Sequence, residues 1–150
     1  MKNFRIAIGA DHRGFALKEF IKQTLDTDII WTDVGCTSDE RCDYPEFAVA
    51  VAQRVQKHED DRGILLCGSG VGMSIVANRF DGIYAALAWD EIIARLSHED
   101  DNSNILVLPA DFVSQERVVD MIRTWLQSSF SGGRYAERIK QIDQLGGLKI

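Results

Sequence analysis

The chain of 150 residues lacks any apolar run long enough to cross a membrane, and residues 1–9 lack the apolar core of a signal peptide. It also has no excess of basic residues. The net charge of −6 argues against nucleic acid or an anionic membrane as a partner, although a local cluster of arginines could bind a small anionic metabolite. A small anionic metabolite therefore stays possible as a ligand, and the cysteine usage of the chain fits a cytoplasmic protein.

Metal ligands are also scarce. The three cysteines, Cys36, Cys42 and Cys67, are an odd number without the paired spacing of a zinc site, and the three histidines are scattered. We expect reduced thiols and no metal site. The sequence assigns no role to Cys36 or Cys42.

Short β-branched runs alternate with longer amphipathic stretches along the whole chain, which suits one domain over residues 1–150. We expect strands at residues 4–10, 28–34, 63–67, 83–88 and 104–108. We expect helices at residues 15–25, 44–56, 71–79, 90–99, 114–128 and 134–145, with Ser114 capping the fifth. Strict alternation of this kind predicts a Rossmann-like, three-layer α/β sandwich, in which helices cover both faces of a five-stranded parallel sheet and a C-terminal helix follows.

In such a sheet, ligands bind beyond the carboxyl ends of the strands, near a switch in strand order. Three loops with chemically useful residues are expected at that edge. They are residues 9–14 after the first strand, residues 67–72 after the third, and the loop after the fourth strand. We expect these loops to converge.

The loop after the third strand is the most informative feature of the chain. An apolar strand ends at Cys67, and glycines follow at positions 68, 70 and 72 with Ser69 between the first two. Such a loop directs several backbone N–H groups to one point and adds the positive end of a helix. A thiol there is expected to have a lowered pKa and to act as a base or nucleophile. The structural alternative is a core cysteine followed by a glycine turn.

Two further pairs of residues admit a structural and a functional interpretation. Asp11 can cap the helix that begins near residue 14, or Asp11 and His12 can transfer protons and bind an anion. Arg134 and Arg138 share one face of the last helix, where they form either a solvated surface or a binding site for a phosphate monoester.

Taken together, these motifs resemble the type B ribose-5-phosphate isomerases and the related galactose-6-phosphate isomerase subunits. The resemblance covers nearly the whole chain. It is carried by residues 9–15, 43–45, 67–72, 77–80 and 132–134, together with Arg138.

The resemblance implies aldose–ketose isomerisation of a phosphosugar, by default ribose 5-phosphate to ribulose 5-phosphate, without metal or organic cofactor. Cys67 would move a proton between C1 and C2 through a cis-enediolate, and Asp11 would relay protons between the two oxygens. Ser69 and the loop N–H groups would stabilise the oxyanion. The loop residues concerned are Gly68, Gly70, Val71 and Gly72.

The resemblance also implies how the rest of the substrate is held. Tyr44 would line the pocket, while His12, Arg134 and Arg138 would hold the phosphate. Proteins of this family look like homodimers with sites shared between subunits, and the dimers are often paired into tetramers.

The chain departs from the family pattern at three acidic positions. A His-Asn pair that opens the furanose ring is replaced by Asp100 and Asp101, with His98 two residues upstream, and a phosphate-binding arginine is replaced by Asp111. A carboxylate beside a phosphate is unfavourable by about 1 kcal/mol or more.

These departures leave the substrate open. The chain could act on an open-chain tetrose phosphate or another sugar phosphate, or as a subunit of a heteromeric isomerase. A non-catalytic phosphosugar-binding protein and a thiol enzyme with a covalent Cys67 intermediate are the rival classes.

Overall fold

A sheet of five parallel strands forms the centre of the molecule, in the order β2-β1-β3-β5-β4. The computed structural model describes residues 3–27 and 29–145, so Met1, Lys2 and Asp28 lie outside the described residues. The strands are β1 (Phe4–Ala10), β2 (Ile29–Asp33), β3 (Arg62–Cys67), β4 (Ala85–Leu87) and β5 (Ile105–Pro109). The expected parallel sheet is confirmed.

Strand β4 is shorter than expected because side chains take over its first hydrogen bonds. It lies at the edge of the sheet and pairs only with β5. The Tyr84 N–H donates to Asn104 Oδ1 at 2.9 Å, and the Ala85 N–H donates to Asn78 Oδ1 at 2.8 Å. The Ile83 N–H donates to the Phe80 carbonyl at 3.1 Å, so neither N–H of residues 83–84 takes part in the ladder.

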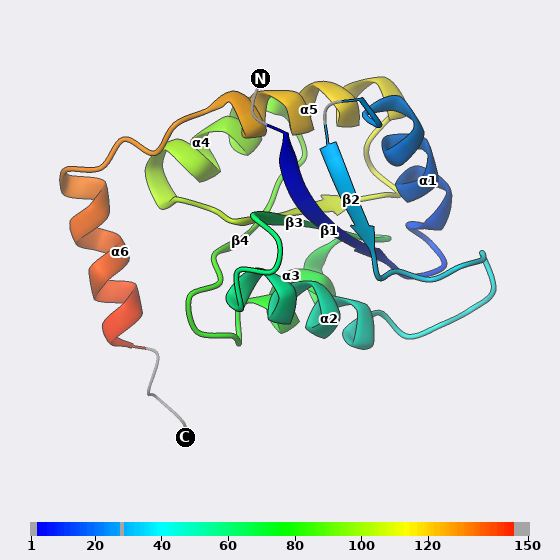
Figure 1. Cartoon of the computed structure of the whole chain (residues 1–150), viewed down its shortest axis with the longest axis horizontal. Helices are drawn as coiled ribbons and strands as arrows, with labels where there is room; N and C mark the ends of the chain where they lie inside the picture. The colour runs from blue at the N-terminus through cyan, green and yellow to red at the C-terminus, as the bar shows by residue number, and fades with distance from the viewer. Residues whose placement is uncertain (1–2, 28, 146–150) are drawn as a thin grey trace.

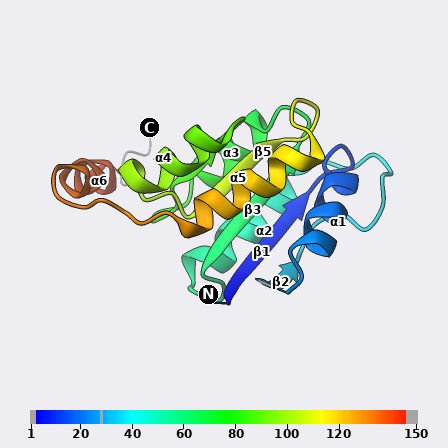
Figure 2. The ribbon, with the colours of Figure 1, turned by 90° about the horizontal axis from the view of Figure 1, so that it is seen from above.

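Helices cover both faces of the sheet, as Figures 1 and 2 show. They are α1 (Phe15–Thr24), α2 (Tyr44–Gln56), α3 (Val71–Ala77), α4 (Glu91–Asp101), α5 (Gln115–Gln127) and α6 (Arg134–Gln144). One buried cluster packs α1, α4 and α5 on one face, and a second packs α2 and α3 on the other. The Rossmann-like three-layer sandwich is thus confirmed. No helix within residues 3–27 and 29–145 combines the length and apolarity needed to span a membrane.

Local sequence accounts for where these helices begin and which side they bury. On α1, Leu17 and Ile21 are buried one turn apart, and Leu25 continues the same stripe just beyond the helix. Pro45 lies in the first turn of α2, where its missing N–H costs nothing. Ser114 caps α5 by accepting a hydrogen bond from the Arg117 N–H at 3.3 Å.

The last helix stands away from the rest of the molecule, at the left of Figure 1. Its principal contacts are with α4, and the Ser131 N–H just before it donates to the Glu99 carbonyl at 2.9 Å. Because α4 leads into β5, its last turn lies at the amino edge of the sheet. The start of α6 therefore lies at the edge opposite to the end of β3.

The switch in strand order falls between β1 and β3, since the chain moves from β1 to β2 on one side, and from β3 to β4 and then back to β5 on the other. The Asp11 N–H donates to the Leu66 carbonyl at 3.3 Å, and the Asp111 N–H donates to the Gly68 carbonyl at 3.0 Å. The loops after β1, β3 and β5 are thereby tied together. The expectation that the third loop follows the fourth strand is wrong, because β5 and not β4 lies beside β3.

Candidate active site

A hollow of about 590 Å³ opens at this carboxyl edge, and we call it the Cys67 hollow. The loops after β1, β3 and β5 and the first turns of α2 and α3 form its walls, at the place where ligands bind in sheets of this topology. Its lining residues are Asp11, Arg13, Tyr44, Cys67, Gly68, Ser69, Val71, Gly72, Ile75, Asp111 and Phe112.

Cys67 ends β3, and its sulfur occupies the anion cradle that the sequence predicts. The backbone N–H groups of Ser69, Gly70 and Met73 favour the thiolate and act to lower its pKa. Burial outweighs them and raises the pKa of the thiol above its ordinary value, and the Asp11 carboxylate acts in the same direction. The expected lowering of this pKa is therefore wrong for the free protein, because only 5% of Cys67 is exposed.

Two glycines shape the loop around this sulfur. Gly70 has a φ of 77°, a left-handed conformation in which a side chain would be strained, and it turns the chain into α3. Gly72 lies under the Tyr44 ring, where a Cβ would be 2.4 Å from Tyr44 Cζ. The absence of a side chain at Gly72 lets Tyr44 cover the loop and form a wall of the hollow.

Asp11 combines both roles that the sequence leaves open. Its Oδ1 accepts hydrogen bonds from the N–H groups of Arg13 at 3.0 Å and Gly14 at 3.2 Å, which braces the start of α1. The carboxylate is also buried and lines the hollow beside Cys67. Among the described residues, Oδ2 has no hydrogen-bond donor and remains available to a ligand.

Ser69 is exposed and lines the hollow. Its Oγ accepts a hydrogen bond from the Val71 N–H at 3.3 Å, so the hydroxyl proton is left to donate to a ligand. Within residues 3–27 and 29–145, the Gly72 N–H has no acceptor either. Both donors belong to residues that line the hollow, so both are available to a ligand there.

His12 lies beside the hollow and is absent from its lining. Its Nδ1 is 3.2 Å from the Cys42 carbonyl oxygen and 3.3 Å from the Cys42 nitrogen, so the ring is held against the loop between β2 and α2. This loop is itself fixed to the sheet, because the Cys36 N–H donates to the Ala10 carbonyl at 3.0 Å.

Arg134 and Arg138 do not reach the Cys67 hollow of their own chain. Both guanidinium groups lie against the Tyr135 ring, at 5.1 and 5.5 Å from its centre. This cluster sits at the start of α6, near Asp100 at the end of α4, and so at the amino edge of the sheet. Within one chain the two arginines and Cys67 are at opposite ends of the strands.

His98 is part of the protein interior. Helix α4 extends two residues beyond the expected end, so His98, Asp100 and Asp101 share its last turn, and only His98 points inward. Its Nδ1 lies 2.9 Å from the Ser103 carbonyl oxygen, so Nδ1 carries the proton and Nε2 accepts from Arg62 Nη2 at 3.0 Å. Burial and the positive charge of Arg62 lower the pKa of His98.

This environment predicts a loss of stability in acid. Because the folded-state pKa of His98 lies below the ordinary 6.5, the unfolded chain binds its proton first, and folding stability falls as pH drops through 6.5. In urea titrations between pH 8 and 5, His98→Gln should lose less stability than the wild type. His58→Asn, a change at an exposed histidine, should follow the wild type. Parallel curves for His98→Gln and wild type would contradict this assignment.

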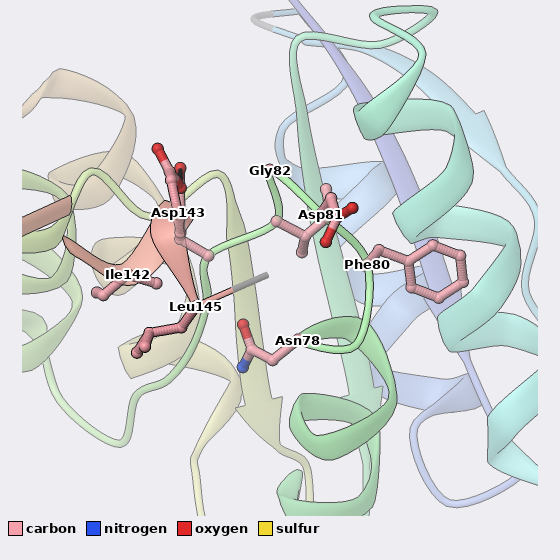
Figure 3. Close-up of a pocket in the computed structure, with 9 residues that line it drawn as sticks. Asn78, Phe80, Asp81, Gly82, Ile142, Asp143 and Leu145 are labelled. Atoms are coloured by element: carbon pink, nitrogen blue, oxygen red, sulfur yellow. Dashed lines mark hydrogen bonds between the residues drawn. The ribbon is translucent and has the colours of Figure 1, made fainter. Parts of the chain in front are cut away.

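A second hollow of about 650 Å³ lies at the other edge of the sheet. Figure 3 shows residues of the segment before β4, such as Asn78 and Asp81, facing Ile142 and Asp143 of α6. Its described lining carries two carboxylates and no basic side chain, which is unsuited to a phosphate. Nor does any group of three or more His, Cys, Asp or Glu side chains among the described residues suit a metal ion.

Three lining residues of the Cys67 hollow were not assigned from the sequence, namely Arg13, Ile75 and Phe112. Arg13 forms an ion pair with Asp111, and Phe112 is exposed beside them. The sequence does contain the ion pair's two residues, an arginine in the loop after β1 and an aspartate in the loop after β5. Recognising the ion pair required knowing that β1 and β5 flank β3.

A doubly wound sheet with a thiol, a hydroxyl and a carboxylate around a hollow at its switch point defines a small-molecule enzyme of the α/β class. The chain belongs to the Ribose/Galactose Isomerase family, whose model matches residues 6–142.

Individual relatives are similar over nearly the whole chain. A ribose-5-phosphate isomerase B of Escherichia coli (strain K12) is 39% identical over 139 residues, which are 92% of this chain and 93% of that protein. A D-erythrulose-4-phosphate isomerase of Pectobacterium atrosepticum is 35% identical, with 91% of each chain covered. The crystal structure of ribose-5-phosphate isomerase B from Mycoplasma genitalium with bound ribulose-5-phosphate gives a TM-score of 0.93 at 37% identity, covering 99% of this chain and 100% of that chain.

Proposed function

We propose that this protein interconverts an aldose phosphate and a ketose phosphate, with ribose 5-phosphate and ribulose 5-phosphate as the default pair, through proton transfer by Cys67. The observation that carries the proposal is the position of the thiol. Cys67 lines the hollow together with Asp11, and three backbone N–H groups favour its thiolate. A base in this position can reach a substrate carbon while a carboxylate reaches the adjacent oxygens.

The reaction is a balanced proton transfer. The Cys67 thiolate takes the proton from C2 of the open-chain aldose, which gives a cis-enediolate and a neutral thiol. The thiol then returns the proton to C1, while Asp11 Oδ2 carries a proton from the C2 oxygen to the C1 oxygen. These steps move protons only, so they consume no oxidant or reductant, and the base ends in its starting form.

The developing oxyanion needs donors that the sulfur does not already use. The N–H groups of Ser69 and Gly70 serve the thiolate. We therefore assign oxyanion stabilisation to the Ser69 hydroxyl and the Gly72 N–H, both of which face the hollow without a protein acceptor. Tyr44 forms the wall on the other side of Gly72.

Arg134 and Arg138 can take part only if a second subunit supplies them. We infer a homodimer in which the start of α6 of one protomer faces the Cys67 hollow of its partner, so that the two arginines and His12 hold the phosphate. Exposed apolar side chains at the hollow (Val71, Ile75) and on α6 (Ile142) provide surfaces for such contacts. The three free cysteines suit a reducing cytoplasm.

A tetrose phosphate is the second candidate substrate. Asp100 lies near Arg134, so it would enter the partner's site together with the arginines, where it cannot act as a ring-opening histidine. A tetrose phosphate cannot form the furanose ring and does not need that step. One of the relatives is a D-erythrulose-4-phosphate isomerase, so a four-carbon sugar phosphate is a definite substrate to test.

Aldose phosphates of four, five and six carbons, assayed in D₂O, should distinguish these possibilities. We expect ketose formation with deuterium incorporated at C1, because the base exchanges its proton with solvent before returning it. A non-catalytic binding protein would give no ketose and no deuterium incorporation. A thiol enzyme would give a covalent adduct at Cys67, visible by mass spectrometry. Absence of ketose from every substrate would contradict the proposal.

A further inference from the structure

We propose that Arg13 binds the substrate phosphate and that Asp111 is the positioning residue that aims its guanidinium. This inference rests on the proposed function, because it requires a phosphorylated ligand in the Cys67 hollow. It assigns to the first loop a cation that neither the motifs nor the comparisons identify.

The position of Arg13 places its charge directly over the catalytic loop. A Cβ on Gly68 would lie 2.8 Å from Arg13 Nε and 2.9 Å from its Cζ, so the guanidinium covers the residue that follows Cys67. The backbone beneath it is fixed, since the Arg13 N–H donates to Asp11 Oδ1 at 3.0 Å. The loop that carries Asp11 therefore also holds the guanidinium against Gly68, within the lining of the hollow.

Arg13 is the single basic side chain in the described lining of the hollow, which also contains Asp11 and Asp111. A phosphosugar brings up to two negative charges to this place, next to a thiolate and a carboxylate. The arginines of α6 belong to the opposite edge of the same chain, and His12 is turned toward Cys42. Within the described lining of one protomer's hollow, the positive charge that attracts a phosphate therefore comes from Arg13.

Asp111 is arranged to orient the guanidinium and leaves most of its donors free. The Asp111 backbone N–H donates to the Gly68 carbonyl at 3.0 Å, which fixes the carboxylate over the loop. It accepts from Arg13 Nη2. A guanidinium has five N–H donors in a planar fork, so the Nε and Nη1 donors remain for a phosphate.

The pair does not serve stability. The Arg13 side chain is 59% exposed and the Asp111 side chain 32% exposed, and ion pairs at such exposure contribute little to folding. The ion pair also offsets the repulsion that the carboxylate at position 111 would otherwise exert on a phosphate. The carboxylate charge is matched by Arg13, so a phosphate approaching from the hollow meets the guanidinium first.

The test compares Arg13→Gln with Arg117→Gln. Arg117 is an exposed arginine on α5 that is paired with Glu91 and lies outside the hollow. For the aldose phosphate that the wild type turns over best, Arg13→Gln should raise KM by about tenfold or more with kcat changed by less than about threefold. Arg117→Gln should leave both constants unchanged.

Binding of inorganic phosphate, measured by calorimetry, provides a readout that does not depend on turnover. We expect Arg13→Gln to weaken it by about tenfold, and Arg13→Gln/Asp111→Arg to restore it to within about threefold, because the cation returns to the same place from the neighbouring loop. Unchanged phosphate affinity in Arg13→Gln, or a fall in kcat at constant KM, would overturn the assignment. If the wild type binds phosphate through Arg13 but isomerises no substrate, the proposed function fails and this inference stands.

Discussion

Replacing Cys67 with alanine is expected to reduce kcat for isomerisation by about 10²- to 10⁴-fold or more, the range of a lost general base. Alanine cannot accept the C2 proton, and none of the other described groups at the floor of the hollow lies within the cradle of N–H groups that favours an anion there. The side chain lost is small, so the fold should persist. Initial rates of ketose formation and thermal unfolding measure the two effects separately.

Cys36→Ala is the matched control. Cys36 is also a buried thiol, with 8% exposed, and burial together with Cys42 raises its pKa to about 11. It is not among the residues that line the hollow. We expect its variant to keep kcat within about twofold of the wild type, since no step in the proposed transfer uses this thiol. Equal losses of kcat in Cys67→Ala and Cys36→Ala would point to a folding defect and not to the loss of a catalytic base.

The raised pKa of Cys67 gives the same proposal a pH signature. The thiolate is the base, and its fraction grows about tenfold per pH unit below the pKa. With the pKa raised above 9.0, kcat/KM should increase with pH through the neutral range and beyond pH 9. A profile that is flat between pH 6 and pH 9 would exclude the thiolate of the free enzyme as the base.

The sequence predicts the elements of this fold well because their periodicity is local. The stripe of Leu17, Ile21 and Leu25 and the cap at Ser114 depend on neighbours within a few turns. Helix and strand positions follow from such signals without knowledge of the tertiary structure.

Features that depend on strand order or burial could not be obtained in this way. Arg13 and Asp111 are 98 positions apart and meet only because β1 and β5 flank β3. The Cys67 pKa is set by burial, which opposes the helix terminus and wins. The separation of Arg138 from the hollow is a property of α6, whose position no local pattern encodes.

Because Arg138 lies far from the Cys67 hollow of its own chain, the proposed dimer can be tested by mixing two defective variants. Cys67→Ala and Arg138→Ala should each be nearly inactive at low substrate concentration, the first through kcat and the second through an increase in KM of about tenfold or more. Mixed and refolded together in equal amounts, they should recover about a quarter of the wild-type activity. Random pairing makes half of the dimers mixed, and each mixed dimer holds one intact site of two.

The matched control is a mixture of Cys67→Ala with Ser69→Ala. Both residues come from the same loop and line the same hollow, so every site in a mixed dimer retains one defect and no activity should return. Recovery in the first mixture and none in the second would place Arg138 and Cys67 of one site on different protomers. Activity in the first mixture equal to the sum of its separate components would mean that Arg138 serves no partner. Because Arg138 cannot reach the hollow of its own chain, the phosphate would then be held by the protomer's own cation, Arg13.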